Sequence, residues 1–207
     1  MERRRRNCYM DGDARMSGPA MNKMTRPVGT ATYQDVLDAP PNMVAEIIHG
    51  ALHTHPRPAP RHAVAHSSLG MEIGRHFHKG RGGPGGWWIL DEPEVHFGTD
   101  VLVPDLGGWR RERMPNIPDT AWFETVPDWV CAVLSPATRT HDVTDKRDIY
   151  GSVGVRHIWF IDPDARTLEA FVNEGGDWHL VAALRDDDPV SVAPFDAITF
   201  KLDYLWA

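Results

Sequence analysis

The run WVCAVL at residues 129–134, followed at once by Ser135-Pro136, constrains the fold of this chain more than any other stretch. Six apolar residues in succession are typical of a β-strand that is covered on both of its faces. The Ser-Pro pair ends the strand, because proline cannot donate a hydrogen bond to a sheet. We therefore expect a strand inside a sheet, with other elements packed on each side.

Predicted helices and strands alternate on both sides of this run. Helices are expected over residues 33–39, 62–79 and 141–153, and strands over 43–48, 51–55, 87–97, 99–109, 129–134, 155–162, 167–174 and 177–184. In the second helix, the spacing predicts an apolar stripe at Val64, Leu69, Ile73 and Phe77. The order of elements predicts one domain of the α/β or α+β class with a mixed sheet, over residues 31–207.

The composition favours a soluble single domain. Of the 207 residues, 42% are hydrophobic and 25% are charged, which is ordinary for a packed soluble protein. No apolar run approaches the roughly 20 residues that span a bilayer, and we expect no secretory signal. Cys8 and Cys131 are the only cysteines, so we expect no disulfide framework and a reducing, cytoplasmic location.

Charge is distributed unevenly along the chain. Residues 1–26 carry seven basic and three acidic side chains, whereas the rest carries 15 basic and 26 acidic ones. We expect residues 1–30 to be a flexible basic arm, either a phosphate-binding tail or a leader without a function of its own. The acidic body argues against broad, non-specific binding of nucleic acid. It leaves room for a local basic cleft or for carboxylates that hold a metal.

Two carboxylates stand where the strand pattern predicts apolar side chains. Glu46 alternates with apolar residues on one face of a predicted strand, and Asp105 ends the run DVLVPDL on the same side as Val101 and Val103. A buried carboxylate is costly unless it is paired or binds a metal. Taken alone, Glu46 also fits an edge-strand charge and Asp105 a turn aspartate.

Lys146 lies on or beside the inward face of the predicted helix over residues 141–153. It comes three residues before Ile149 and four before Tyr150, both of which belong to the apolar stripe of that helix. A lysine in this position either extends its ammonium group to solvent or directs it into a site. The spacing leaves both arrangements open.

Eleven histidines raise the question of a metal site. His53 and His55 share one face of a predicted strand, and His62 and His66 lie four residues apart on a predicted helix. Such pairs can hold zinc, but no cysteine or carboxylate spacing completes a known zinc set, and hydrogen-bonding histidines are the simpler interpretation. The nucleophile elbow, the P-loop and H-E-x-x-H are absent. A zinc-dependent hydrolase that uses the histidines stays open as one functional class.

Several segments, taken together, resemble one known family. The matching stretches, in the family's order, are TYQDVLDAP, AEIIHGAL, PAPRHAVAHSSL, VPDL, PDWVCAVLSPATRTHD, DKRDIYGSVGVRHIWFIDPDARTLEAF and GGDWHLV. Over residues 31–207 the chain is similar to the Uma-two family, a large bacterial group of predicted endonucleases. The resemblance implies the restriction-endonuclease-like PD-(D/E)XK fold, in which a mixed central sheet flanked by helices carries a cluster of metal-binding carboxylates.

The resemblance also implies an activity, the metal-dependent hydrolysis of DNA phosphodiester bonds with Mg²⁺ or Mn²⁺. Asp105 would be the aspartate of the PD motif and would bind the metal together with Glu46. Lys146 would stabilise charge on the phosphate, and His62 would orient a reactant or contact phosphate. Candidates for further phosphate contacts are Arg57, Arg61, Arg139 and Arg147. Because cutting both strands of a duplex needs two sites, a homodimer is compatible with this activity.

Position 132 departs from the family pattern. The family carries glutamate there, in the sequence EVLSP, whereas this chain reads AVLSP with Ala132. The missing carboxylate would be the partner of Asp105 at the metal, so metal affinity and cleavage rate should both fall. Two explanations stay open: a natural loss that leaves a non-catalytic nucleic-acid-binding protein, or an engineered alanine that disables a toxic nuclease. We favour the second, because the neighbouring motif residues remain in place.

Overall fold

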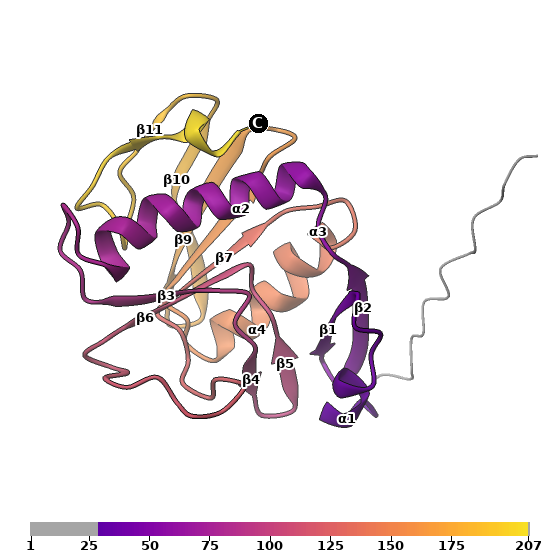
Figure 1. The fold of residues 1–207 in the computed structure, drawn as a ribbon. Coiled ribbons are helices and arrows are strands. Elements are labelled where there is room, and N and C mark those ends of the chain that lie inside the picture. The colour runs from indigo at the N-terminus through magenta and orange to yellow at the C-terminus, as the bar shows by residue number, and fades with distance from the viewer. Residues whose placement is uncertain (1–28, 207) are drawn as a thin grey trace, which may run out of the picture.

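The computed structural model describes residues 29–206 (Figure 1). Residues 1–28, which hold Cys8 and most of the predicted basic arm, lie outside the described residues. The helical elements are α1 (Tyr33–Leu37), α2 (Pro60–Ile73), η1 (Gly74–His78), α3 (Arg139–His141), η2 (Asp142–Lys146), α4 (Arg147–Ser152) and η3 (Leu202–Leu205). The strands are β1 (Met43–Ile48), β2 (Ala51–Pro56), β3 (Trp87–Asp91), β4 (Val95–Phe97), β5 (Asp100–Leu102), β6 (Leu106–Arg110), β7 (Trp129–Val133), β8 (His157–Asp162), β9 (Thr167–Glu174), β10 (Asp177–Arg185), β11 (Pro189–Val190) and β12 (Phe200–Lys201). Within the described chain, no helix is both long enough and apolar enough to cross a membrane.

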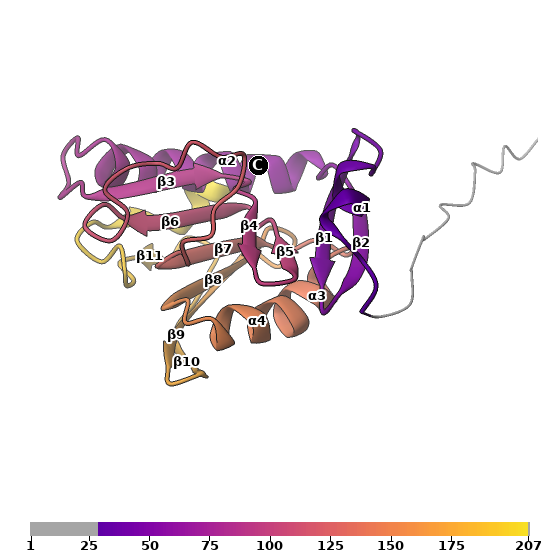
Figure 2. The same cartoon turned by 90° about the horizontal axis from the view of Figure 1, so that it is seen from below.

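The central sheet has six strands in the order β10-β9-β8-β7-β6-β3. Strands β7 and β8 run parallel and the other neighbours run antiparallel, so the sheet is mixed, as the sequence predicts. The parallel pair is connected through α3, η2 and α4, because parallel neighbours require a long crossover. Figure 2 shows α2 on one face of this sheet and α4 on the other.

Strand β7 lies inside the sheet and is covered on both faces. Trp129, Cys131 and Val133 pack into the apolar cluster that contains the α2 side chains, whereas Val130 and Ala132 pack into the cluster that contains those of α4. All five side chains are buried. The prediction of a strand covered on both faces is confirmed, and position 132 is placed on the α4 side.

A second sheet of four strands, in the order β2-β1-β5-β4, lies beside the central one (Figures 1 and 2). The strands predicted over residues 43–48 and 51–55 are present as β1 and β2, which pair as an antiparallel hairpin. Its two turn residues, His49 and Gly50, have φ angles of 51° and 71°. Positive φ at both positions matches the twist of the strands that a two-residue turn connects.

The run predicted as one strand over residues 99–109 forms two strands that belong to different sheets. Strand β5 pairs with β1 and β4 in the smaller sheet, and β6 pairs with β3 and β7 in the central one. Pro104 lies between them, where it has no N–H to donate to a ladder. Asp105 therefore precedes β6, and the prediction that it ends a strand alongside Val101 and Val103 is wrong.

The buried face of α2 differs from the predicted stripe at its first position. The last three residues of the stripe are buried as expected, but Val64 is 38% exposed. His62 and His66 are buried instead. Because side chains four residues apart on a helix share a face, these histidines continue the stripe of Leu69 and Ile73 toward the start of the helix. They place two imidazole rings against the ends of the central strands.

Gly107, two residues after Asp105 in β6, allows a close approach that a larger residue would block. A Cβ atom there would lie 2.7 Å from Pro93 Cγ and 2.9 Å from the Trp109 ring. We expect Gly107→Ala to lower the free energy of unfolding by about 1–3 kcal/mol through overpacking. The control is Gly74→Ala, at a helical position with no neighbouring atom of the described chain within 4 Å of the added Cβ. Gly74→Ala should raise the free energy of unfolding by about 0.5–1 kcal/mol. If Gly74→Ala instead lowers it as much as Gly107→Ala does, the packing argument is contradicted.

Candidate active site

Asp105 occupies the place where the chain passes between the two sheets. Its Oδ2 accepts a 2.7 Å hydrogen bond from the Val133 N–H of β7. His62 Nε2, in the first turn of α2, lies 3.1 Å from Oδ1. Burial alone would lower the pKa of His62, but the adjacent Asp105 carboxylate raises it above its ordinary value. Both oxygens of this carboxylate therefore face nitrogen atoms of other elements.

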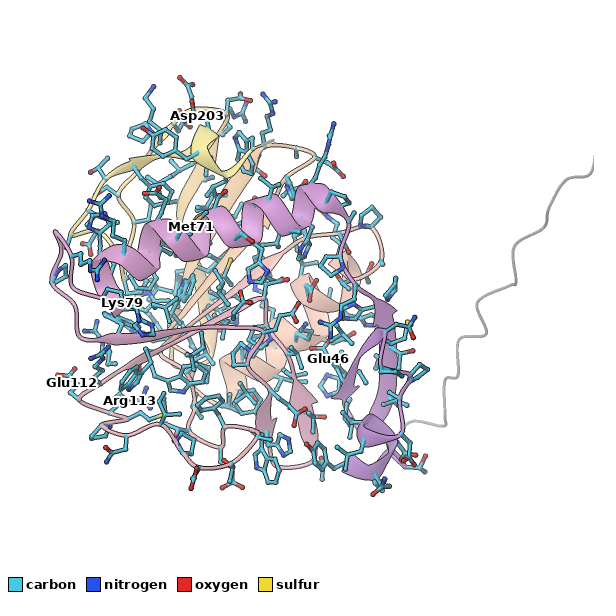
Figure 3. The ribbon with its side chains drawn as sticks, viewed as in Figure 1. Glu46, Met71, Lys79, Glu112, Arg113 and Asp203 are labelled. Atoms are coloured by element: carbon cyan, nitrogen blue, oxygen red, sulfur yellow. The ribbon has the colours of Figure 1, made fainter. Side chains whose placement is uncertain are left out.

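Glu46 is the second carboxylate, and it is buried on β1. Figure 3 shows it on the side of the β1–β2 hairpin that faces the rest of the molecule. Its Oε1 accepts a hydrogen bond from the Val103 N–H at 2.7 Å and lies 2.9 Å from Lys146 Nζ. Burial alone would raise the pKa of this carboxyl, but the charge of Lys146, with His55 and Val103 beside it, lowers the pKa to about 2. Glu46 is therefore a paired, ionised group.

Lys146 directs its ammonium group into the protein and not to solvent, the two arrangements that its spacing allowed. Its Nζ lies 2.9 Å from Glu46 Oε1 and 2.9 Å from Asp142 Oδ1. Burial alone would lower the pKa of Lys146, but these two carboxylates hold it well above its ordinary value. Asp142 was not singled out from the sequence. Its position four residues before Lys146 on the same helical stretch is the signal that would have found it.

A pocket of about 330 Å³ brings these groups together. Its lining includes Asp105, His62, Lys146 and Asp142, with walls from residues 55–59 and 135–138. Three of the five predicted catalytic positions thus share one cavity. Glu46 lies behind Lys146 and lines a neighbouring cavity of about 240 Å³.

Ala132 does not line this pocket, and its side chain contributes no polar group. It is 4% exposed and belongs to the apolar cluster that also contains Leu134 and Tyr150. Its neighbour Val133 is the residue whose N–H binds Asp105. A longer side chain at position 132 would start beside that hydrogen bond, on the face of the sheet that α4 covers.

The two histidine pairs, His62 with His66 and His53 with His55, have different surroundings. His62 and His66 form a three-donor group with Asp105, whose ligand atoms all lie within 4.8 Å of one another. The sequence singled out Asp105 but did not connect it with these histidines, because it is distant from both of them along the chain. In the other pair, His55 lies 3.7 Å from Glu46 Oε2 and the His53 ring packs 4.5 Å from that of His141.

The four arginines predicted to contact phosphate occupy different surroundings. Arg57 lines the pocket and lies 2.8 Å from Glu92 Oε2. Arg61 lies 3.5 Å from Asp164 and Arg139 pairs with Asp162. Arg147 lies over the Phe171 ring, 4.7 Å from its centroid. Of the four, only Arg57 lies in the wall of the pocket that holds Asp105 and Lys146.

Comparison with known proteins identifies relatives of the whole fold. The model of the Uma2 family, described as "Putative restriction endonuclease", matches residues 31–203. Among solved structures, a putative nuclease of the DUF820 group from Anabaena variabilis is similar, with a TM-score of 0.69 and 23% sequence identity. The alignment covers 84% of this chain and 97% of that one. None of the curated proteins compared with the chain matched it.

The buried charges predict a specific pattern of stability changes. Lys146→Met would leave Glu46 and Asp142 buried without their shared cation, and should lower the free energy of unfolding by about 3–5 kcal/mol. Adding Glu46→Gln to that variant should recover part of the loss, because it removes one of the unpaired charges. Urea unfolding of both variants measures the effect.

The control is Lys79→Met, because Lys79 is exposed and its side chain should contribute within about 0.5 kcal/mol. Equal stabilities for Lys146→Met and Lys79→Met would show that the buried cluster is not held by the lysine charge. A further loss on adding Glu46→Gln would contradict the assignment of Glu46 as an unpaired charge in the Lys146→Met variant.

Proposed function

Since the chain belongs to the Uma2 family, we propose that it is a metal-dependent DNA endonuclease whose cleavage is impaired by the alanine at position 132. The observation that carries the proposal is the pocket shared by Asp105 and Lys146. In metal-assisted hydrolysis of a phosphodiester, a carboxylate holds the ion that activates water. A nearby cation offsets the charge that develops on the phosphate.

The oxygen donors of the site are too few for a strong Mg²⁺ site. Mg²⁺ prefers oxygen ligands in octahedral geometry. Asp105 supplies one carboxylate, and Asp142, which also lines the pocket, is already engaged by Lys146. Glu46 is already engaged by Lys146 and by the Val103 N–H. A glutamate at position 132 would add a second carboxylate next to Asp105, since the Val133 N–H already binds Asp105. The proposal of impaired cleavage rests on this shortage.

The chain's own residues suggest how the remaining roles divide. Lys146 would stabilise negative charge on the scissile phosphate, while Glu46 and Asp142 keep its ammonium group in place. His62 would keep the Asp105 carboxylate oriented. Arg57, at the pocket wall, would exchange Glu92 for a DNA phosphate.

A non-catalytic nucleic-acid-binding protein is the second candidate, and Ala132 is the observation that favours it. Such a protein would keep the nuclease fold and the contact of Arg57 with a DNA phosphate, but it would not regain cleavage when a carboxylate is restored.

DNA as the substrate, a homodimer and a cytoplasmic location remain predictions. Light scattering of the purified chain with and without duplex DNA tests the dimer.

Restoring the carboxylate is the direct test of the proposed function. We expect Ala132→Glu to raise Mg²⁺- or Mn²⁺-dependent cleavage of plasmid or single-stranded DNA by at least about 100-fold over the parent chain, the order that one stabilising group at a reacting centre contributes. Ala132→Gln, which has the same size but no charge, should stay at the parent level. Gel electrophoresis of the products measures the rate.

The double variant Ala132→Glu with Asp105→Asn locates the site. It should lose the restored cleavage, because the metal then keeps only one of its two carboxylates. If Ala132→Glu is inert on every substrate, the nuclease proposal fails and the non-catalytic candidate takes its place. If cleavage survives Asp105→Asn, the metal lies elsewhere.

A further inference from the structure

Two histidines of α2 meet two aspartates at the ends of the central strands. His62 Nε2 lies 3.1 Å from Asp105 Oδ1, and His66 Nε2 lies 2.6 Å from Asp91 Oδ1. Asp91 ends β3, and Asp105 comes just before Leu106, the residue that faces Asp91 across the β3–β6 ladder. The antiparallel pairing of β3 with β6 therefore brings both aspartates under the first two turns of α2.

The ring of His66 carries a buried nitrogen without a hydrogen bond. Its side chain is 8% exposed, and Nε2 has no hydrogen-bond partner within residues 29–206. The Asp91 oxygen is close, but it forms no hydrogen bond with this nitrogen. A neutral imidazole has one nitrogen with a free lone pair, which is the atom that binds metals. A buried imidazole nitrogen that lies 2.6 Å from a carboxylate oxygen without a hydrogen bond is stabilised when a cation binds both atoms.

The spacing of the donors suits a metal ion. The ligand atoms of His62, His66 and Asp105 lie within 4.8 Å of one another. Ligands bound tetrahedrally at about 2.0–2.1 Å lie about 3.3–3.4 Å apart, and the His62–Asp105 distance of 3.1 Å is close to this value. Small side-chain rotations would bring the third donor to the same separation.

We infer that His62, His66 and Asp105 bind one divalent transition-metal ion of the Zn²⁺ or Co²⁺ type. Two imidazole nitrogens with one carboxylate oxygen favour such ions, whereas Mg²⁺ prefers oxygen alone. Asp91, whose side chain is 77% exposed and whose Oδ1 lies beside His66 Nε2, would supply a fourth ligand. This site shares Asp105 with the proposed Mg²⁺ or Mn²⁺ site of the nuclease, and the inference does not depend on cleavage.

Metal titration of the untagged full chain tests the inference without an activity assay. After chelator treatment and dialysis, we expect one equivalent of Co²⁺ to bind and to give the visible absorption bands of a tetrahedral site. Zn²⁺ should displace it and raise the melting temperature. His66→Gln should weaken Co²⁺ binding at least about 100-fold, beyond the 10–100-fold typical of an outer-shell partner.

Two further variants keep the result interpretable. Asp91→Asn alters an exposed side chain, so it should fold normally, and it should weaken Co²⁺ binding because a neutral amide oxygen is a poorer ligand than a carboxylate. His179→Gln removes an exposed histidine of β10, remote from α2, and should bind Co²⁺ like the parent. Circular dichroism of the metal-free variants confirms that each is folded before binding is compared.

The outcomes separate the inference from the proposed function. Absence of a one-equivalent Co²⁺ site in the parent, or unchanged binding by a folded His66→Gln, overturns the metal site. Co²⁺ binding in the parent together with an inert Ala132→Glu leaves the metal site standing and removes the nuclease proposal. Cleavage by Ala132→Glu without a Co²⁺ site in the parent leaves the nuclease proposal standing and removes the metal site.

Discussion

The segment Val103-Pro104-Asp105 carries the chain from one sheet to the other, and two hydrogen bonds to carboxylates hold its ends. The Val103 N–H donates to Glu46 on β1, and the Val133 N–H of β7 donates to Asp105. Only Pro104, with its fixed φ angle, separates the two ends. The Glu46 and Asp105 carboxylates are therefore anchored close to one short, stiff crossing. Val103 and Asp105 of this crossing line the pocket.

A buried cation between two carboxylates is expensive to form. Lys146, Glu46 and Asp142 are each at most 4% exposed, and such ion clusters often contribute less to stability than apolar side chains of the same volume. Strongly shifted pKa values in a cavity are more typical of functional sites. The cluster beside Asp105 is thus better explained by the chemistry of the pocket than by the needs of the fold.

The sequence predicted what local patterns determine and missed what depends on pairing between distant segments. The apolar run of β7 and the two short strands that flank His49-Gly50 are local signals, and both predictions are confirmed. The break at Pro104 was missed, because alternation continues through it although the two halves join different sheets. His66 and Asp105 were not connected, since their proximity follows from the packing of α2 on the central sheet, and no spacing along the chain encodes it.

In the proposed function, β7 would be the scaffold of a nuclease site that lacks one carboxylate at position 132. Anomalous diffraction at the manganese absorption edge, from crystals of Ala132→Glu grown with Mn²⁺, tests this most directly. The account predicts an anomalous peak within coordination distance of both Asp105 and the introduced carboxylate. An ordered side chain at position 132 that turns away from Asp105, with no peak beside it, would contradict the account.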